Sequence, residues 1–360
     1  MSGQADYVII GGGLVGMLTA LELYKTGARI VVADAGIPQA SWAAGGILSP
    51  LPPWGYADAV SELIKTSVTM LFSIINEVQK LSGIDCNWNR AGMLVLPSKN
   101  SQRLAAWRKE NYSTAVPVRW LAPLLATDGY GEWLPAIAQL QPRLLLKALR
   151  YTLRQYGVAF YPAVQQVEVS GDRAKVVRLQ DGSILQGSAY VLCAGAASEA
   201  LCPPPAPPVT PMRGQILLYA PDKPLLCTVL REEDGLYLSP RSDGLLVGST
   251  CEDVGFDNRT TAVVIAALHR RACELFPALR RTPPINAWSG LRPMLHDNIP
   301  VIDRHPKLCN FYLNTGHSRY GISMAPAAAR RLLAVMRREG DPGAYAFRND
   351  WTSSIRNGRS

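Results

Sequence analysis

A glycine-rich turn near the N-terminus constrains the fold of this chain more than any other feature. A short apolar strand over Tyr7–Ile10 leads into a G-x-G-x-x-G pattern made of Gly11, Gly12, Gly13, Leu14, Val15 and Gly16. The first glycine permits a tight turn, the second lets the backbone approach a pyrophosphate, and the third lets a helix pack closely on the strand. That helix is predicted over Met17–Thr26, and the free N–H groups at its start favour phosphate.

The residues after this helix complete a β-α-β unit. A second strand is predicted over Ala28–Ala33, and it ends at Asp34, 18 residues beyond Gly16. A carboxylate at this position accepts hydrogen bonds from a ribose diol, and its charge disfavours a 2′-phosphate. Strand, helix, strand and acid together predict a dinucleotide site. The alternative is a glycine turn that binds no ligand.

The composition indicates the cellular compartment and bears on whether the protein binds a metal. Of the 360 residues 48% are apolar, but no apolar run reaches the ~18 residues of a membrane span, and the N-terminus does not look like a secretory signal. The seven cysteines are scattered without a C-x-x-C pair, which favours free thiols in a reducing cytoplasm. The four histidines show no metal-ligand spacing, so we predict no metal.

The net charge of +9 raises the question of an acidic partner. Lysines and arginines are dispersed, and the pairs Arg330-Arg331 and Arg337-Arg338 lie on a predicted amphipathic helix, where solvated charges are usual. We therefore predict no nucleic-acid partner. A basic face can instead attract anionic substrates or touch anionic lipid, and peripheral membrane contact is the less favoured of these two.

Two kinds of segment alternate along the chain. The apolar strand Ala189–Cys193 belongs in a central parallel sheet, since both its faces must be covered. After the proline-rich connector Cys202–Pro208, strands over residues 215–219, 235–239 and 244–249 predict an antiparallel sheet. Further helices are predicted over residues 57–81, 102–110, 143–156, 262–275 and 324–338, and further strands over 91–96, 157–169 and 174–179.

This alternation predicts an α/β protein with two interleaved domains. A Rossmann-type dinucleotide-binding domain takes residues 1–50, 140–205 and 285–350. An α+β substrate domain, built on a mainly antiparallel sheet, takes residues 51–139 and 206–284. Residues 351–360 form a C-terminal tail.

Four further motifs accompany the glycine turn. They are Ala40-Ser41-Trp42-Ala43-Ala44-Gly45-Gly46-Ile47-Leu48-Ser49-Pro50, Pro211-Met212-Arg213-Gly214-Gln215, Trp288-Ser289-Gly290-Leu291-Arg292-Pro293 and Asn314-Thr315-Gly316-His317-Ser318-Arg319-Tyr320-Gly321. Together they make the chain resemble the FAD-dependent D-amino-acid oxidase superfamily, nearest to its glycine oxidase branch tied to thiamine biosynthesis. The first resembles the second flavin loop of that family, and the others its P-x-[KR]-G-Q, W-x-G-L-R-P and T-G-H-x-R-x-G. The resemblance runs from about residue 5 to residue 345.

The resemblance implies that the bound dinucleotide is FAD. A Gly-Gly pair lets backbone N–H groups approach a flat ring, and the N-terminus of the last helix can stabilise charge on a reduced flavin. Cys309 does not match the cysteine that links flavin covalently in related sarcosine oxidases, so non-covalent FAD is expected. The candidate FAD-binding residues are Gly11, Gly12, Gly13, Leu14, Val15, Gly16, Asp34, Ser41, Trp42, Ala43, Ala44, Gly45, Gly46, Ile47, Val164, Ala194, Gly195, Arg292, Gly316, His317, Ser318, Arg319, Tyr320, Gly321 and Ile322.

Three side chains are candidate catalytic residues. The Arg292 guanidinium suits a carboxylate, which it can bind through two parallel N–H···O bonds; the alternative is a surface arginine at a turn. Tyr237 matches a family tyrosine that helps to hold this carboxylate, although a strand tyrosine is commonly a core residue. Arg319 matches a second arginine near the pocket, with a structural salt bridge as the alternative.

The substrate pocket is expected to include Ile47, Cys251 and His317. Cys251 replaces a bulky methionine of the glycine oxidase pattern, which leaves room for N-substituted or larger amino acids. His317 either assists oxygen activation or packs near the flavin. Asn298 and Asp303 stand where the pattern has glycine, and we expect the Asp303 carboxylate to alter packing or redox tuning on the flavin side.

The resemblance implies oxidative deamination. Glycine, sarcosine, another N-alkylglycine or a D-amino acid would lose a hydride to flavin N5, and oxygen would re-oxidise the flavin. The products are an oxo acid, ammonia or an amine, and hydrogen peroxide, and the family suggests a homo-oligomer. Three alternatives remain: a dehydrogenase that passes electrons to a quinone or carrier, a flavoprotein that acts on a partner protein, and an NAD enzyme using the glycine turn alone. The loop at residues 41–50 argues against the NAD enzyme, because it resembles the second flavin loop of the family.

Overall fold

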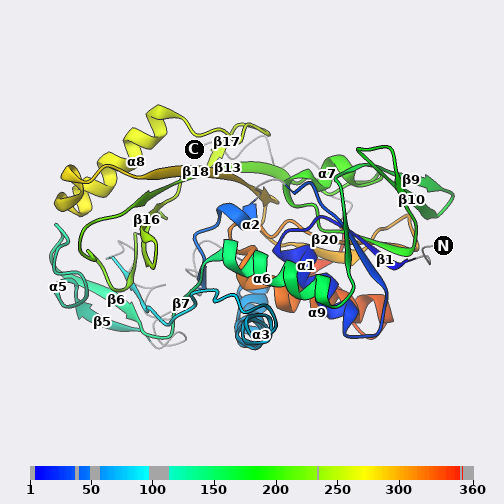
Figure 1. Ribbon diagram of the computed structural model, residues 1–360, viewed down its shortest axis with the longest axis horizontal. Coiled ribbons are helices and arrows are strands. Elements are labelled where there is room, and N and C mark those ends of the chain that lie inside the picture. Colours follow the sequence, from blue (N-terminus) through cyan, green and yellow to red (C-terminus); the bar gives the residue numbers. More distant parts are fainter. Residues whose placement is uncertain are drawn as a thin grey trace.

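The glycine turn follows β1, an inner strand of a six-stranded sheet (Figure 1). This computed structural model describes residues 5–36, 40–48, 57–96, 113–232, 235–348 and 351. The strand order is β19-β20-β12-β1-β2-β8, with all neighbours parallel except β19, which is antiparallel to β20. The strands are β1 Ala5–Ile10, β2 Ile30–Ala33, β8 Ala159–Tyr161, β12 Gly187–Leu192, β19 Val301–Arg304 and β20 Phe311–Thr315.

The two faces of this sheet are covered by different kinds of element. Ile9 and Val191 pack on the helical side, while Val8, Ile10 and Tyr190 pack on the other, as alternation along a strand requires. The helices are α1 Leu14–Tyr24, α3 Asp58–Ser82, α6 Pro142–Gln155 and α9 Gly321–Arg337. A three-stranded antiparallel sheet covers the opposite face, formed by β9 Val164–Ser170, β10 Arg173–Leu179 and β11 Ile184–Leu185.

A second, nine-stranded sheet is mainly antiparallel. Its order is β17-β13-β16-β15-β14-β4-β6-β5, with β18 paired to β13, and only β4 and β14 are parallel neighbours. Helix α8, Ala262–Leu275, packs on it through an apolar cluster. The strands are β4 Met93–Val95, β5 Thr114–Pro117, β6 Tyr130–Leu134, β13 Thr210–Tyr219, β14 Val229–Arg231, β15 Tyr237–Arg241, β16 Gly244–Gly248, β17 Glu252–Asp253 and β18 Asn286–Met294.

Short elements connect the two sheets. Figure 1 shows the long strands β13 and β18 reaching from the second sheet, beside α8, to the region of the first sheet. The short helices are α2 Ala40–Ala43, α5 Val118–Leu121 and α7 Ser198–Leu201, and β3 Ile47–Leu48 pairs with β7 Ala138–Gln139. Single 3₁₀ turns are η1 Gly195–Ala197, η2 Pro277–Arg281, η3 Ser318–Tyr320 and η4 Gly343–Tyr345.

The predicted α/β fold, with a central parallel sheet and a mainly antiparallel second sheet, is confirmed. The chain alternates between the sheets, with β1 and β2 in the first, β4 to β6 in the second, β8 and β12 in the first, β13 to β18 in the second, and β19 and β20 in the first. The domain boundaries remain a prediction. The helix predicted over residues 102–110 lies outside the described residues.

Some predicted elements begin earlier in the structure. Helix α1 starts at Leu14, within the G-x-G-x-x-G pattern, and Gly13 with its extended backbone is the N-cap residue. Strand β13 starts at Thr210 because β18 already pairs with it there, and this pairing continues to Leu218. Helix α9 starts at Gly321, ahead of its apolar repeat, since η3 leads directly into it.

The glycine turn depends on a backbone contact between Gly11 and Gly16. Gly11 has a left-handed φ of 111°, and its N–H donates to the Ala33 carbonyl at 2.8 Å. A Cβ on Gly16 would overlap the Gly11 carbonyl oxygen and lie 3.3 Å from the Cys193 side chain. Helix α1 therefore packs against β1 at a distance that excludes any side chain at Gly16.

We expect Gly16→Ala to lower the free energy of unfolding by about 1–3 kcal/mol, because the added methyl group overpacks this contact. Urea unfolding measures it. Gly321→Ala is the control, since Gly321 has a helical φ of −51° and the nearest atom to an added Cβ is 3.5 Å away. The control should be at least as stable as the wild type, and equal stability of Gly16→Ala and the wild type would contradict the prediction.

Candidate active site

The start of α1 offers a phosphate-sized backbone surface. Gly13 is the N-cap residue and has no side-chain cap, and a Cβ there would lie 3.3 Å from Ser41 Oγ. The Leu14 N–H donates to that same oxygen at 3.1 Å. Ser41, a candidate from the second flavin motif, therefore lies beside the first motif. A helix N-terminus framed by glycines, with no cap from the side chain of its own N-cap residue, fits the pyrophosphate of a dinucleotide.

Asp34 lies against the same turn. A Cβ on Gly12 would come within 2.6 Å of the Asp34 carboxyl carbon. The carboxylate forms an ion pair with Arg150 of α6, whose guanidinium lies 4.4 Å from the Phe160 ring centroid. Sequence reasoning missed Arg150, since nothing in the sequence links it to Asp34. An ionised carboxylate has about four acceptor sites, so this ion pair leaves acceptor capacity for a ribose hydroxyl.

The second flavin loop is held close to two other segments by its glycines. Gly46 has a left-handed φ of 81°, and its carbonyl accepts a hydrogen bond from the Leu140 N–H at 3.0 Å. A Cβ on Gly46 would lie 2.9 Å from Pro142 Cδ. A Cβ on Gly45 would lie 2.8 Å from Cζ of the Tyr237 ring. The loop therefore presents bare backbone to the candidate substrate residue Tyr237.

The loop before α9 is shaped by two residues with left-handed backbones. Ser318 (φ 52°) donates to Asn298 Oδ1 at 2.7 Å, and Asn298 has a φ of 61°. This explains why asparagine can stand where glycine is common, because asparagine tolerates this conformation and its amide oxygen holds Ser318. Gly316 has a φ of 81°, and a Cβ there would press on Leu295.

His317 is buried beside this turn. Its side chain is 2% exposed, and among the described residues its Nε2 has no hydrogen-bond partner. Burial lowers the pKa of His317 to about 3, so the ring is neutral at physiological pH. A neutral imidazole with one free buried nitrogen is suited to a polar neighbour that the protein itself does not supply.

Arg292 is held in a fixed plane on β18. Its Nη1 donates to the Thr250 carbonyl at 2.8 Å, and its Nη2 donates to Ser249 Oγ at 2.7 Å. The guanidinium lies directly over Gly214, where any Cβ would overlap it. Because Gly214 of P-M-R-G-Q has no side chain, it leaves the space that the Arg292 guanidinium occupies.

Tyr237 meets Arg292 through Ser249. Its hydroxyl forms a hydrogen bond with the Ser249 side chain, and a Cβ on Gly248 would lie 2.9 Å from that hydroxyl. Burial raises the pKa of Tyr237, and the nearby positive charge of Arg292 opposes the shift. The phenol is therefore a hydrogen-bond donor at neutral pH. Sequence reasoning missed Ser249, although it directly precedes Thr250 and the candidate Cys251.

A buried polar network supports the segment that holds Arg292. Arg213 is 4% exposed and forms an ion pair with Glu252 at 2.8 Å. Glu252 also accepts from Thr250 Oγ1 at 2.5 Å and Gln215 Nε2 at 3.0 Å. Burial raises the Glu252 pKa, but the hydrogen bonds from Arg213, Thr250 and Gln215 outweigh it, so the carboxyl pKa lies below its usual value. Arg213 and Gln215 of P-M-R-G-Q are thus positioning residues for Thr250.

The remaining candidates are distributed over several elements. Cys251 is exposed, beside Thr250. Arg319 is exposed and approaches the Gly235 backbone, where a Cβ would lie 3.7 Å from its Nη1. Ile47 packs against the apolar cluster under β4. The others lie at strand ends or on α9: Val164 at the start of β9, Ala194 and Gly195 after β12, Tyr320 in η3, and Ile322 in α9.

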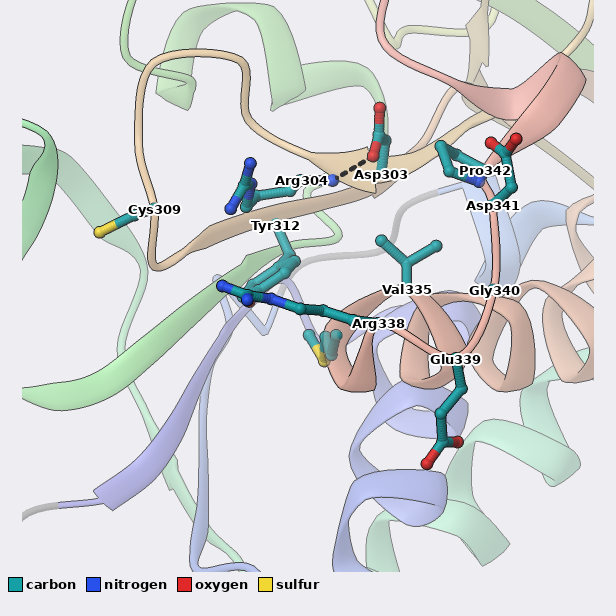
Figure 2. A pocket seen from close by; sticks show the side chains of 11 residues that line it. Asp303, Arg304, Cys309, Tyr312, Val335, Arg338, Glu339, Gly340, Asp341 and Pro342 are labelled. Carbon is teal, nitrogen blue, oxygen red and sulfur yellow. Dashed lines mark hydrogen bonds between the residues drawn. The ribbon is translucent and has the colours of Figure 1, made fainter.

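Asp303 does not face the flavin loops. Its carboxylate accepts from the Arg304 N–H at 2.7 Å and the Phe347 N–H at 2.9 Å. Figure 2 shows it in a pocket with residues from the C-terminal end of α9, the opposite end of that helix from Gly321. The carboxylate therefore fastens the C-terminal segment, in contrast to the flavin-side role expected from the motif.

Among the described residues, no group of three or more histidines, cysteines or acids is arranged to hold a metal ion. In the same part of the chain, no helix is both long and apolar enough to cross a membrane.

The buried His317 generates a pH prediction for stability. Between its folded pKa of about 3 and its ordinary value of 6.5, the unfolded chain binds a proton that the folded chain does not. Stability is therefore full above pH 6.5 and falls as the pH drops toward 3, by up to about 1.4 kcal/mol per pH unit from this residue. We expect His317→Asn to remove that part of the slope in urea unfolding. His296→Gln, at an exposed position, should retain it, and equal slopes for His317→Asn and the wild type would contradict the prediction.

Comparison with known proteins identifies the family. The family described as FAD dependent oxidoreductase (DAO) matches residues 6–335. A glycine oxidase from Pseudomonas aeruginosa is 34% identical, covering 94% of this chain and 97% of the relative. Two solved structures share the fold at 22% identity: glycine oxidase from Geobacillus kaustophilus (TM-score 0.84, covering 96% of this chain and 99% of that one) and iminodiacetate oxidase from a Chelativorans species (TM-score 0.86, 94% and 98%).

The site described above fits the cofactor of this family. The uncapped start of α1, the bare backbone at Gly45 and the unpartnered Nε2 of His317 are places where a dinucleotide and a polar ring can be received. The chain belongs to the DAO family of FAD-dependent oxidoreductases, and FAD is its cofactor.

Proposed function

We propose that this protein catalyses the oxidative deamination of glycine or a related small amino acid, such as sarcosine, another N-alkylglycine or a D-amino acid. The products are an oxo acid, ammonia or an amine, and hydrogen peroxide. The observation that carries the proposal is the Arg292 guanidinium and the Tyr237 hydroxyl meeting at Ser249, beside the backbone of the second flavin loop. The name of the Pseudomonas aeruginosa relative, glycine oxidase, supports the same substrate class.

Four parts of the chain would hold FAD. The turn over Gly11–Gly16 and the start of α1 suit the pyrophosphate, and Asp34 suits the ribose. The loop at residues 40–47 and the segment at residues 316–322 suit the flavin. When bound, FAD supplies the acceptor for the hydride that leaves the substrate α-carbon.

The protein side of the mechanism is mainly orientation. Arg292 binds the substrate carboxylate through parallel N–H···O bonds, and Tyr237, kept protonated by burial, donates a further bond. With the carboxylate held at two points, one face of the α-carbon is presented and the reacting atoms are brought close. We nominate no protein general base, and neutral His317 serves as a polar neighbour rather than as an acid.

The position of Cys251 favours a substrate larger than glycine. Its small side chain is exposed directly after Thr250, whose carbonyl holds Arg292. We therefore propose that this side accommodates a substituent on the substrate nitrogen or α-carbon. One structural neighbour is an iminodiacetate oxidase, and iminodiacetate is an N-substituted glycine.

Two features support further parts of the proposal. All seven cysteines are free thiols, which fits the reducing cytoplasm. Cys309 contacts Arg173 at 3.2 Å and lies in the pocket of Figure 2, by the C-terminal end of α9, which fits non-covalent FAD. We also propose that the protein forms a homo-oligomer, as the family resemblance implies.

The deciding experiment is anaerobic bleaching of the purified protein's ~450 nm flavin band by glycine, sarcosine and D-alanine, followed by air. Bleaching with one of them, and recovery with peroxide, supports the oxidase. Bleaching without recovery in air indicates a dehydrogenase that uses a quinone or carrier. No bleaching by any of the three, with flavin bound, rules out these three substrates and leaves a larger or unusual amine, or a flavoprotein that acts on a partner protein.

We expect Arg292→Ala to keep the bound flavin but to lose kcat/KM by about 10²- to 10⁴-fold, since truncating one partner of a buried charge pair costs roughly 3–5 kcal/mol. Arg292→Lys should recover little, because an ammonium cannot form the parallel bonds. Steady-state kinetics with the preferred substrate measures both. Arg259→Ala, at a position whose side chain is 86% exposed, is the control and should behave as the wild type. Normal kinetics for Arg292→Ala would remove the carboxylate assignment.

A further inference from the structure

One half-buried arginine outside the recognised motifs lies between two of them. Arg143, the second residue of α6, has its guanidinium carbon 3.5 Å from the centroid of the Trp42 ring and 4.1 Å from that of Trp288. The two indoles meet edge to face, with centroids 6.3 Å apart. Trp42 belongs to the second flavin motif and Trp288 to W-S-G-L-R-P, so the arginine joins both.

Hydrogen bonds fix the same three residues to the flavin loop. Arg143 Nε donates to the Trp42 carbonyl at 3.2 Å, and Trp288 Nε1 donates to the Ala43 carbonyl at 3.1 Å. Two successive carbonyls of α2 are therefore held from two sides. Figure 1 shows α2 between β18 and α6, and both elements contact it.

The loop has a second attachment further along. The Gly46 carbonyl accepts from the Leu140 N–H at 3.0 Å, two residues before the start of α6. The backbone between these attachments, at Ala44 and Gly45, is the part that approaches Tyr237. The position of this bare backbone is therefore set from α6, with Arg143 as the polar contact at its first attachment.

The cluster also reaches the strand of Arg292. Trp288 precedes Arg292 by four residues on β18, and residues an even number apart on a strand share a face of the sheet. Trp288 and Arg292 therefore belong to the same face of one rigid strand. Whatever fixes Trp288 against the flavin loop also fixes the strand that carries the candidate carboxylate anchor.

Arg143 retains an unused donor at this junction. Its Nη2 is buried and has no hydrogen-bond partner among the described residues. Burial lowers the pKa of Arg143, nearby Arg241 lowers it further, and Asp243 opposes the change. The two ring faces stabilise the charge in place of a carboxylate. A buried unpaired N–H group is unfavourable in the protein alone, so its presence beside the flavin loop points to an acceptor on a bound molecule.

We propose that Arg143 is a positioning residue of the FAD site: stacked between Trp42 and Trp288, it fixes the backbone of the second flavin loop against β18 and so sets the flavin relative to Arg292. The FAD part of this inference follows from the family, and the Arg292 part rests on the proposed function. Lysine cannot replace this arginine, because it lacks the flat guanidinium that two rings can contact.

The test compares Arg143→Lys and Arg143→Met with the wild type. FAD affinity is measured by titrating apoprotein with FAD, and kcat and KM are measured on the reloaded enzyme. We expect both variants to bind FAD at least about tenfold more weakly, with Arg143→Met the weaker. We also expect kcat to fall more than KM rises, because the flavin and the bound substrate lose their relative position.

The matched control is Arg154→Met on the same helix. Arg154 is exposed and lies 5.5 Å from the Phe160 ring centroid, away from the flavin loop, so its loss should leave FAD affinity unchanged. If Arg143→Met fails to fold, Trp42→Phe and Trp288→Phe provide the same readout, since each weakens one ring contact and keeps an aromatic side chain. Trp288→Phe also removes the bond to Ala43.

The outcomes separate this inference from the proposed function. Wild-type FAD affinity in both Arg143 variants, with only a lower melting temperature, would overturn the positioning role and leave a packing role. Because FAD affinity is measured without substrate, it does not depend on which amine the enzyme oxidises. Failure of glycine, sarcosine and D-alanine to bleach the wild type would instead reject these three substrates, and the FAD titration would still decide the role of Arg143.

Discussion

The antiparallel ladder between β13 and β18 runs from Thr210 opposite Met294 to Leu218 opposite Asn286. Arg292 lies opposite Met212, and its side chain crosses diagonally over Gly214, the neighbour two residues along. A shift of the register by one residue would turn Arg292 to the other face of the sheet and away from Ser249 and Thr250. The ladder therefore sets the candidate carboxylate site, and through Trp288 it also sets the flavin loop.

The site is assembled largely from positions that lack side chains. Gly45 and Gly248 leave room for the Tyr237 ring, and Gly214 leaves room for the Arg292 guanidinium. These glycines come from loops and strands far apart in the chain, so the fit exists only after both sheets have formed. The polar groups also need partners that fix their positions. The ion pair between Arg213 and Glu252 does this for Thr250, whose carbonyl accepts a hydrogen bond from Arg292. Backbone surface gives the site its shape, and buried polar pairs keep that shape fixed.

Local pattern and spacing predicted the β-α-β unit, the central parallel strand and the second antiparallel sheet. The family resemblance supplied Tyr237, and with the W-S-G-L-R-P motif it supplied Arg292. The sequence could not predict partners joined only by tertiary packing. Arg150, Ser249 and Arg143 lie far in sequence from the residues they hold and belong to no recognised motif. For Asp303 the sequence suggested a contact that the structure does not have. Its place in the family pattern suggested the flavin side, but the pattern does not determine which way a strand side chain points, and the carboxylate accepts from Phe347 instead. The roles of the individual site residues remain predictions.

The exposed position of Cys251 has a consequence for how such an enzyme can change over generations. A side chain at Gly45, Gly214 or Gly248 would collide with Tyr237 or Arg292, so substitutions at these glycines would disrupt the site. Cys251 is exposed and directly follows Thr250, so we expect a change in the size of its side chain to leave the backbone that holds Arg292 in place. On the proposed role of Cys251 as a pocket residue, substrate preference can change over generations by single mutations at this position, while the glycines that fit Tyr237 and Arg292 are retained.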